Sequence, residues 1–222
     1  MVRGMLEEVQ HYTESVRNGT LTCDLERCPR CGKRPSGFTR HDQRRRTFLV
    51  VVARIVHKVH SALTRWKCSR CGKPFTLYPS FALPHKRYVR NTVLEKATRY
   101  VEDDAATYRR VVKEPSGSVG YAKTPAGAFD ERQLAHSTVH RWLSSLAGLT
   151  DTLHEALRLI KARFPGSRIF RTIVPIAPWK YRSERRRLQL LSCRRLLQAD
   201  REYRGLFGRS VFPHLATVCA WK

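Results

Sequence analysis

Two nearly identical six-residue segments, 40 residues apart, constrain the fold of this chain more than any other feature. They are Cys28-Pro-Arg-Cys31-Gly-Lys33 and Cys68-Ser-Arg-Cys71-Gly-Lys73. Two cysteines separated by two residues can place both sulfurs on one metal ion, and structural zinc takes four ligands in a tetrahedron. The glycine after each second cysteine tolerates the left-handed backbone that points amide N–H groups toward the thiolates. The repeat therefore predicts one structural zinc ion, bound by Cys28, Cys31, Cys68 and Cys71.

Other uses of the cysteines fit the sequence less well. A redox pair would need a helix that opens at its first cysteine, whereas Pro74 closely follows the second pair. A disulfide framework suits a short secreted chain, and the first residues of this chain contain no apolar signal segment. We therefore expect a cytoplasmic, nucleoid-associated protein. Cys193 and Cys219 are expected to be small apolar residues, and Cys23 is a spare candidate ligand.

The charge of the chain indicates a polyanionic partner. Forty-three Lys and Arg residues against 18 Asp and Glu residues leave a net charge of +25. Such a field attracts nucleic acid, because each neutralised phosphate releases counterions. The longest apolar run, Phe48 to Ala53, is too short to span a bilayer, so no membrane partner is expected. Any single arginine in such a chain is more often a solvated surface residue than a phosphate contact. Only the excess of Lys and Arg over Asp and Glu argues for nucleic-acid binding.

The order of patterns predicts an α+β protein that is mainly α. Apolar residues recur at helical spacing and stop at Asn18-Gly19, which predicts an N-terminal helix within residues 1–22. The apolar positions of this helix are Met5, Val9, Tyr12 and Val16.

Residues 23–80 turn to β-branched and aromatic residues and predict a small antiparallel zinc ribbon. Its expected strands are Thr47–Val59, Ala62–Lys67 and Pro74–Tyr78, with a turn near His60-Ser61. So short a segment cannot bury a stabilising core, and metal binding supplies the missing free energy. We expect this module to unfold without zinc.

Residues 81–149 predict a helical domain. A first helix carries apolar residues from Val89 to Val101, and a second, capped by Asp103 or Asp104, carries Tyr108 and Val111. Residues 115–130 are expected to form an inserted loop, because Pro115 to Gly127 is rich in Gly, Pro, Ser and Ala. A third helix should begin at Ser137 as its cap and end at Gly148. Its inward residues would be Val139, Trp142, Leu143 and Leu146.

Three short helices that end in a polar, arginine-bearing helix suit a helix-turn-helix, whose last helix enters the major groove of DNA. An ordinary helical bundle with a basic surface fits the same periodicity. In the first interpretation the contacts with nucleic acid are Lys86, Arg87, Ser137, Thr138, His140 and Arg141.

The C-terminal region, residues 150–222, is predicted to be basic and largely helical. A helix from Asp151 to Phe164 precedes a β-like stretch from Arg168 to Ile176, and a last helix runs from Glu184 to about Tyr203. Leu190 and Leu197 mark the packed side of this helix. From residue 161 onward there are 15 basic and three acidic residues, so the segment could grip the phosphate backbone without reading sequence. The candidate phosphate contacts are Arg187, Arg194 and Arg201. A solvated basic face, or packing against a partner helix, are the alternatives.

Several segments together resemble a known family. These are the two Cys-x-x-Cys-Gly turns, which we call knuckles, the segment Trp66 to Thr76, the junction Leu83 to Tyr88 and the helix His136 to Leu143. The region Cys28 to Leu149 is similar to the zinc-ribbon plus helix-turn-helix region of bacterial insertion-sequence transposase-type proteins. The resemblance implies recognition of element ends or related DNA, with the four cysteines as zinc ligands and the third helix as the reader.

The chain departs from a full transposase because it lacks a recognisable acidic triad. Strand transfer needs separated carboxylates that converge on two metal ions. The late acidic residues, Asp151, Glu155, Glu184, Asp200 and Glu202, have local explanations as caps or partners of arginines. We therefore expect no enzyme but a non-catalytic accessory or regulatory protein of a mobile element.

Two other functions stay open. One is a truncated or divergent transposase that acts with a catalytic partner. The other is an RNA-binding zinc-ribbon protein, in which Trp66, Phe75 and Tyr78 would stack bases if they were exposed. A protein partner or a homo-oligomer is compatible with each of these functions.

Overall fold

The computed structural model describes residues 2–113, 128–130, 134–171 and 174–212. These residues form an α+β fold in which helices outweigh strands, as the sequence predicts. The chain divides into two compact units. Unit 1 is Met1–Arg90 with Phe212–Lys222, and unit 2 is Asn91–Val211. The four segments distinguished in the sequence thus combine into two bodies.

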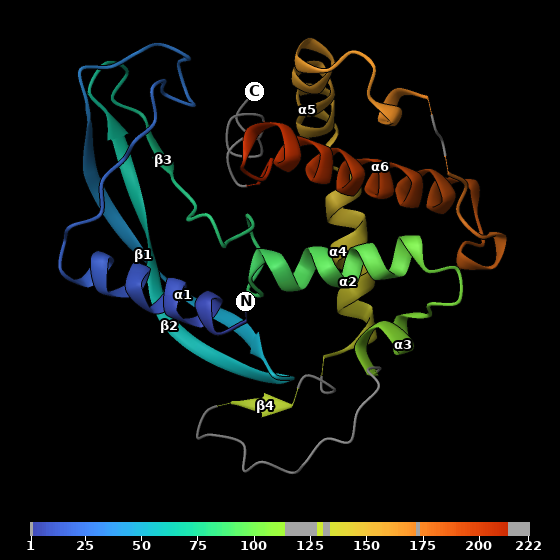
Figure 1. The fold of residues 1–222 in the computed structure, drawn as a ribbon. Helices are drawn as coiled ribbons and strands as arrows, with labels where there is room; N and C mark the ends of the chain where they lie inside the picture. Colours follow the sequence, from blue (N-terminus) through green and yellow to red (C-terminus); the bar gives the residue numbers. More distant parts are fainter. Residues whose placement is uncertain (1, 114–127, 131–133, 172–173, 213–222) are drawn as a thin grey trace. The chain divides into compact units, whose positions relative to one another are not determined.

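Unit 1 is built on a long antiparallel hairpin with a helix packed on it (Figure 1). Its elements are α1 (Val2–Arg17), β1 (Phe38–Val52), β2 (Ile55–Cys68) and β3 (Pro74–Thr76). β1 and β2 pair from Val52 opposite Ile55 to Phe38 opposite Cys68, with a bulge between Arg40 and Asp42. β3 pairs antiparallel with the last residues of β2. The hairpin therefore carries both cysteine pairs at the end away from its turn.

The turn of the hairpin lies at Ala53 and Arg54, not near His60-Ser61, where the sequence placed it. Both turn residues have positive φ values, 46° and 69°. Two successive left-handed residues match the right-handed twist of paired strands, which is the usual geometry of a two-residue hairpin turn. His60 and Ser61 lie inside β2. The segment predicted as a single strand, Thr47–Val59, therefore contains the turn.

The predicted N-terminal helix is confirmed, and its apolar side forms the core of unit 1 with the hairpin. Tyr12 lies at the centre: its ring meets Phe48 and Phe81 edge to face, with centroids 6.4 and 5.4 Å away. Its hydroxyl donates to the Ala62 carbonyl at 3.2 Å. The buried members of this core are Val9, Tyr12, Val16, Phe48, Val50, Leu63, Phe81, Ala82 and Val89. Part of the hairpin is thus held by apolar burial independently of a metal.

Unit 2 is a helical body in which α6 crosses α4 and α5 (Figure 1). Its elements are α2 (Arg90–Glu102), α3 (Tyr108–Lys113), β4 (Phe129–Asp130), α4 (His136–Ala147), α5 (Thr150–Arg163), two 3-10 turns (Arg168–Phe170 and Pro178–Lys180) and α6 (Glu184–Phe207). The predicted inward residues of α4 are buried, and so are Leu190 and Leu197 of α6. Cys193 is buried without a polar role, as expected.

Two cations tie the helices of unit 2 together. Arg186 donates to the Ser144 hydroxyl at 2.8 Å and to the Tyr108 hydroxyl at 2.7 Å, which joins α6 to α4 and α3. Lys180 is buried, and its ammonium donates to the carbonyls of Tyr100 and Asp103 at the end of α2. Both cations are therefore engaged by other residues of the protein, Lys180 in the interior and Arg186 in a half-buried position.

The helix caps differ from the sequence predictions. α4 begins at His136 after Ala135, which makes no side-chain cap, so Ser137 lies in the first turn. α3 is capped by Thr107, whose hydroxyl accepts from the Arg110 amide at 3.1 Å, whereas Asp103 accepts from the Ala105 amide two residues on. The predictions of Ser137 as the cap of α4 and of Asp103 or Asp104 as the cap of α3 are therefore wrong in the residue. A side-chain oxygen does cap α3, but it belongs to Thr107.

Two further predictions concern the connections of unit 2. The expected β-like stretch from Arg168 to Ile176 contains a 3-10 turn instead, stabilised by the Ser167 hydroxyl, which accepts from the Ile169 amide at 3.3 Å. Residues 114–127, which hold most of the predicted inserted loop, lie outside the described residues. Cys219 also lies outside them.

Candidate metal centre and basic surfaces

The two cysteine pairs lie in turns of the same geometry. In each turn the glycine amide donates to the carbonyl of the first cysteine, at 2.8 and 2.9 Å, and the amide of that cysteine donates to the carbonyl of the following lysine. Gly32 and Gly72 have φ values of 70° and 66°, a conformation that favours glycine. The role predicted for these glycines is confirmed.

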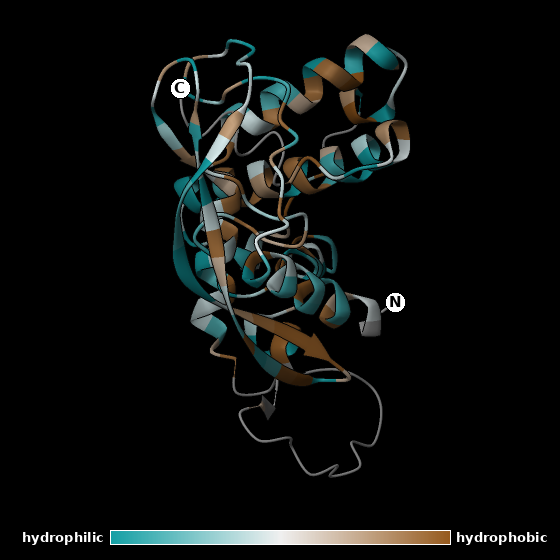
Figure 2. Cartoon of the chain, turned by 90° about the vertical axis from the view of Figure 1, so that its left-hand side faces the viewer, coloured by the Kyte–Doolittle hydropathy of each residue, from teal (hydrophilic) through white to brown (hydrophobic). Residues whose placement is uncertain are grey.

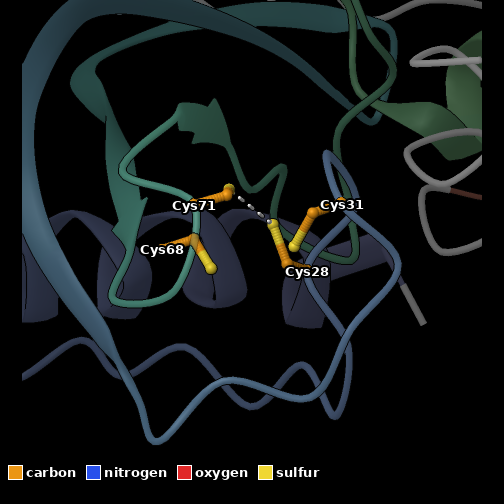
Figure 3. Close-up of side chains that lie close together, drawn as sticks. All are labelled: Cys28, Cys31, Cys68 and Cys71. Carbon is orange, nitrogen blue, oxygen red and sulfur yellow. Dashed lines mark hydrogen bonds between the residues drawn. The ribbon is translucent and has the colours of Figure 1, made fainter.

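The four sulfurs of Cys28, Cys31, Cys68 and Cys71 point toward one another from two separate loops (Figure 3). All lie within 4.8 Å of one another, and the sulfurs of Cys28 and Cys71 are 3.8 Å apart. A tetrahedron with Zn–S bonds of about 2.3 Å has edges of about 3.8 Å, so the separation fits. The four residues could hold a metal ion, and Cys23 lies outside this group.

The thiols differ in their readiness to ionise. Desolvation raises the pKa of Cys28 to about 12. Burial also acts on Cys68, but hydrogen bonds from the amides of Cys71 and Arg70 and from neighbouring sulfurs outweigh it and lower the pKa of Cys68 to about 7. The donors around Cys68 therefore favour its thiolate, the form that metals bind.

A small aromatic core supports the cysteine cluster. Trp66 and Phe75 are only 4% and 1% exposed, and Phe38 meets Phe75 edge to face with ring centroids 5.3 Å apart. Trp66 and Phe75 are therefore packing residues, and the alternative that they stack nucleic-acid bases is wrong. Tyr78 is half-buried and packs against the core around α1.

α4 presents its polar residues outward, as the sequence predicts. Ser137, His140 and Arg141 are exposed, and Thr138 is half-buried. Arg141 donates a long hydrogen bond, 3.5 Å, to the Thr138 hydroxyl. Partial desolvation and the nearby charge of Arg186 lower the pKa of His140. Arg141 contributes a positive charge to this surface.

The arginines of α6 do not form the expected solvent-facing row. Arg194 is only 8% exposed, and its guanidinium donates to the Pro175 carbonyl at 2.8 Å. Its prediction as a phosphate contact is therefore wrong. Arg187 pairs with Glu184 at 2.7 Å, and Arg201 pairs with Glu102 at 2.9 Å.

The predicted pairing with neighbouring arginines is confirmed for Glu184 and Asp200, whereas the partner shown for Glu202 is a serine hydroxyl. Asp200, 2% exposed, binds Arg204 and accepts from the Ser210 hydroxyl and the Val211 amide. Glu155 pairs with Arg158 at 2.9 Å, and Glu202 accepts from the Ser167 hydroxyl at 2.8 Å.

Sequence reasoning missed a basic surface on the hairpin of unit 1. Arg44 and Arg45 are exposed in the middle of β1, and Arg46 donates to the Lys86 carbonyl at 2.6 Å. Figure 2 shows the hairpin hydrophobic near its turn and hydrophilic along its middle. Of the predicted contacts at the junction, Arg87 is exposed and Lys86 half-buried. Three consecutive arginines within a strand were the signal that could have revealed this surface.

Comparison with known proteins adds a family match. The family described as a domain of unknown function (DUF6431) matches residues 28–115. The match begins at the first metal-site cysteine and runs through the hairpin, α2 and α3. No curated protein and no solved structure matches the chain. In the described part of the chain, no helix combines the length and apolar character that a membrane span requires.

Proposed function

We propose that this protein binds duplex DNA and that a structural zinc ion holds the knuckle end of its hairpin together. The observation that carries the DNA-binding proposal is the division of α4: its apolar side is buried, and its first two turns present Ser137, His140 and Arg141 outward. The first turns of a recognition helix are the part that meets base edges. The net charge of +25 supplies the attraction to phosphate.

Zinc is proposed because of the donor set. Four thiolates in a closed tetrahedral cage are typical of structural zinc, and a closed cage leaves no position for a substrate. A zinc ion there would cross-link the loop before β1 to the loop after β2. Cys28, Cys31, Cys68 and Cys71 would hold it, and the knuckle amides would support the sulfur charge.

The biological setting that we propose is a mobile element, in which the protein is a non-catalytic accessory or regulatory factor. This rests on the resemblance of the knuckles, the Trp66 to Thr76 segment and the His136 to Leu143 helix to transposase-type proteins. The helix-turn-helix assignment of α2, α3 and α4 belongs to the same proposal. Localisation with the nucleoid follows from DNA binding.

A competition assay tests the proposal. Zinc-loaded protein is bound to a labelled duplex of mixed sequence at near-physiological salt, and unlabelled duplex or single-stranded RNA of equal length is added. We expect duplex to displace the probe at lower concentration than RNA, because Trp66 and Phe75, two of the aromatic candidates for base stacking, are buried. Displacement by RNA at lower concentration than duplex would contradict DNA as the partner.

A further inference from the structure

The hairpin of unit 1 carries many more positive than negative side chains. Residues 38–68 contain eight Lys and Arg residues and one acidic residue, Asp42. Asp42 is already engaged by Arg65 at 2.9 Å. The hairpin therefore has a surplus of cations that no carboxylate of its own can neutralise.

Arg44 and Arg45 are two adjacent members of this surplus whose side chains are free to bind. Both are exposed, and neither guanidinium has a hydrogen-bond or ion-pair partner among the residues that the structure describes. Arg187 and Arg201 of α6, by contrast, are held by Glu184 and Glu102. A phosphate that bound those α6 arginines would first have to displace a carboxylate.

A hollow on the hairpin lies beside Arg45. It has a volume of about 510 Å³ and is lined by Arg45, Arg46, Thr47, His60 and Ser61. The register places Arg46 opposite Ser61 and Thr47 opposite His60, so neighbouring strands contribute to one depression. The Thr47 hydroxyl and the His60 Nδ1 lie 3.3 Å apart.

Two polar atoms in the lining have unsatisfied hydrogen-bonding capacity. The Nε of Arg46 and the Oγ of Ser61 are shielded from solvent and lack a hydrogen-bond partner. Arg46 is fixed by its bond to the Lys86 carbonyl, so its guanidinium is held in place before any ligand arrives. Buried polar groups are normally satisfied, so these two atoms would gain partners if their side chains shifted to expose them to an anion in the hollow.

We propose that this hollow receives a phosphate of duplex DNA, which Arg45 contacts, and that Arg44, on the other face of the strand, adds to the electrostatic attraction for the backbone. The inference rests on the proposed function, and it assigns the phosphate contacts of DNA binding to unit 1. Guanidinium groups bind phosphate through two parallel hydrogen bonds. A two-stranded β-ribbon also fits the major groove of a duplex, so the hairpin can approach the backbone closely.

The test compares two variants that lose the same charge. Arg44→Gln/Arg45→Gln removes the hairpin pair, and Arg187→Gln/Arg201→Gln removes two arginines of α6. Affinity for a labelled duplex of mixed sequence is measured over a range of salt concentrations. We expect the hairpin variant to bind roughly 10- to 30-fold more weakly near 0.15 M salt and to lose about 1–2 from the salt slope. The α6 variant should stay within about threefold of the wild type.

Two further variants separate binding from folding. Arg44→Lys/Arg45→Lys keeps the point charges and should restore most of the salt slope but less of the affinity, because lysine cannot bind phosphate in bidentate fashion. Ser61→Ala should weaken binding a few-fold with an unchanged melting temperature.

The outcomes are distinguishable. If the wild type binds no duplex, the proposed function fails and this inference with it. If the wild type binds and the two glutamine variants behave alike, only the inference is overturned. A hairpin variant that loses affinity for single-stranded RNA of the same length but not for duplex would overturn the assignment to DNA.

Discussion

At the scale of single residues, function depends on whether a charge is already used inside the protein. Arg141 and Arg194 are indistinguishable as arginines in amphipathic helices, yet Arg141 is exposed and Arg194 is buried against the Pro175 carbonyl. The sequence could not reveal this, because Pro175 comes from a connection whose path is set by tertiary packing. The grouping of the four cysteines was predictable because the geometry of each pair is local to one short turn.

Arg141→Ala should relax the sequence preference of DNA binding while leaving non-specific binding nearly unchanged. Loss of one base-edge contact removes about 1–3 kcal/mol of discrimination. The measurement compares affinities for a preferred site and for a site with altered bases. Arg158→Ala, which removes an exposed arginine paired with Glu155 on α5, is the control. Equal loss on both sites would show that Arg141 contacts only phosphate.

Cys68→Ser should abolish metal retention and lower the melting temperature of unit 1. A serine hydroxyl is a poor zinc ligand, and an incomplete cage loses the binding energy that closes the knuckles. Metal content per chain and thermal unfolding are the measurements. Cys23→Ser, outside the sulfur cluster, should retain the metal. Full metal content in Cys68→Ser would exclude the four-cysteine site.

At the scale of elements, the hairpin shows why turns are harder to predict than strands. The β-branched run through Val50, Val51 and Val52 predicted extended chain correctly, but the turn residues, Ala53 and Arg54, are not the Gly, Asn or Asp that usually mark left-handed positions. The strain at this turn is compensated by the long pairing of β1 with β2. Local residue preference was therefore overridden by strand register.

Ala53→Asn should stabilise the hairpin, because asparagine tolerates the positive φ at this exposed position better than alanine. We expect a gain of up to about 1 kcal/mol in the free energy of unfolding, a part of the left-handed penalty that alanine bears. Thermal or denaturant unfolding measures it. Ala53→Val, which places a β-branched residue at positive φ, should have the opposite effect. A stability order with valine above asparagine would disprove the turn geometry.

The end of α6 is closed by a buried carboxylate. Asp200 binds Arg204 and accepts from the Ser210 hydroxyl and the Val211 amide, and Gly208 ends the helix at a φ of 67°. The sequence predicted a pairing with arginine but not the two bonds from residues after the helix. Those bonds require the chain to reverse at Gly208 and return to the side of α6.

Asp200→Asn should therefore destabilise unit 2 by about 1–3 kcal/mol, since it removes the charge from a nearly fully buried network and brings an amide N–H group toward a donor. Denaturant unfolding is the measurement. Glu155→Gln breaks an exposed pair on α5 and should change stability by no more than about 0.5 kcal/mol. Equal losses of stability in the two variants would mean that the buried Asp200 network stabilises the protein no more than an exposed ion pair does.

At the scale of the whole molecule, the sequence revealed the order of segments but not how they combine. The N-terminal helix was predicted as a separate segment, yet Tyr12 and Val16 complete the core of the hairpin. The sequence distinguished residues after the third helix as a basic region without indicating what this region packs on, and in the structure α6 packs on α4 and α5 within unit 2. Such associations depend on which apolar faces meet, and periodicity within one segment does not encode its partner.

The packing of α1 on the hairpin changes how unit 1 should unfold when the metal is removed. The turn end of the hairpin and α1 share an apolar core, whereas the knuckle end has only the smaller cluster around Trp66 and Phe75. The sequence alone suggested complete unfolding of the ribbon without zinc. The structure leads us to expect that unfolding starts at the knuckles and reaches the α1 core only under stronger denaturing conditions.

The most direct test of the central claim, that this chain reads duplex DNA, is selection from fragmented genomic DNA by the zinc-loaded protein at near-physiological salt, followed by sequencing. Charge alone ensures binding at low salt, so the salt concentration is essential. We predict enrichment of a defined motif, concentrated at the ends of a repeated element. Diffuse enrichment without a motif would contradict sequence recognition by α4. It would mean that the arginines bind DNA without sequence preference.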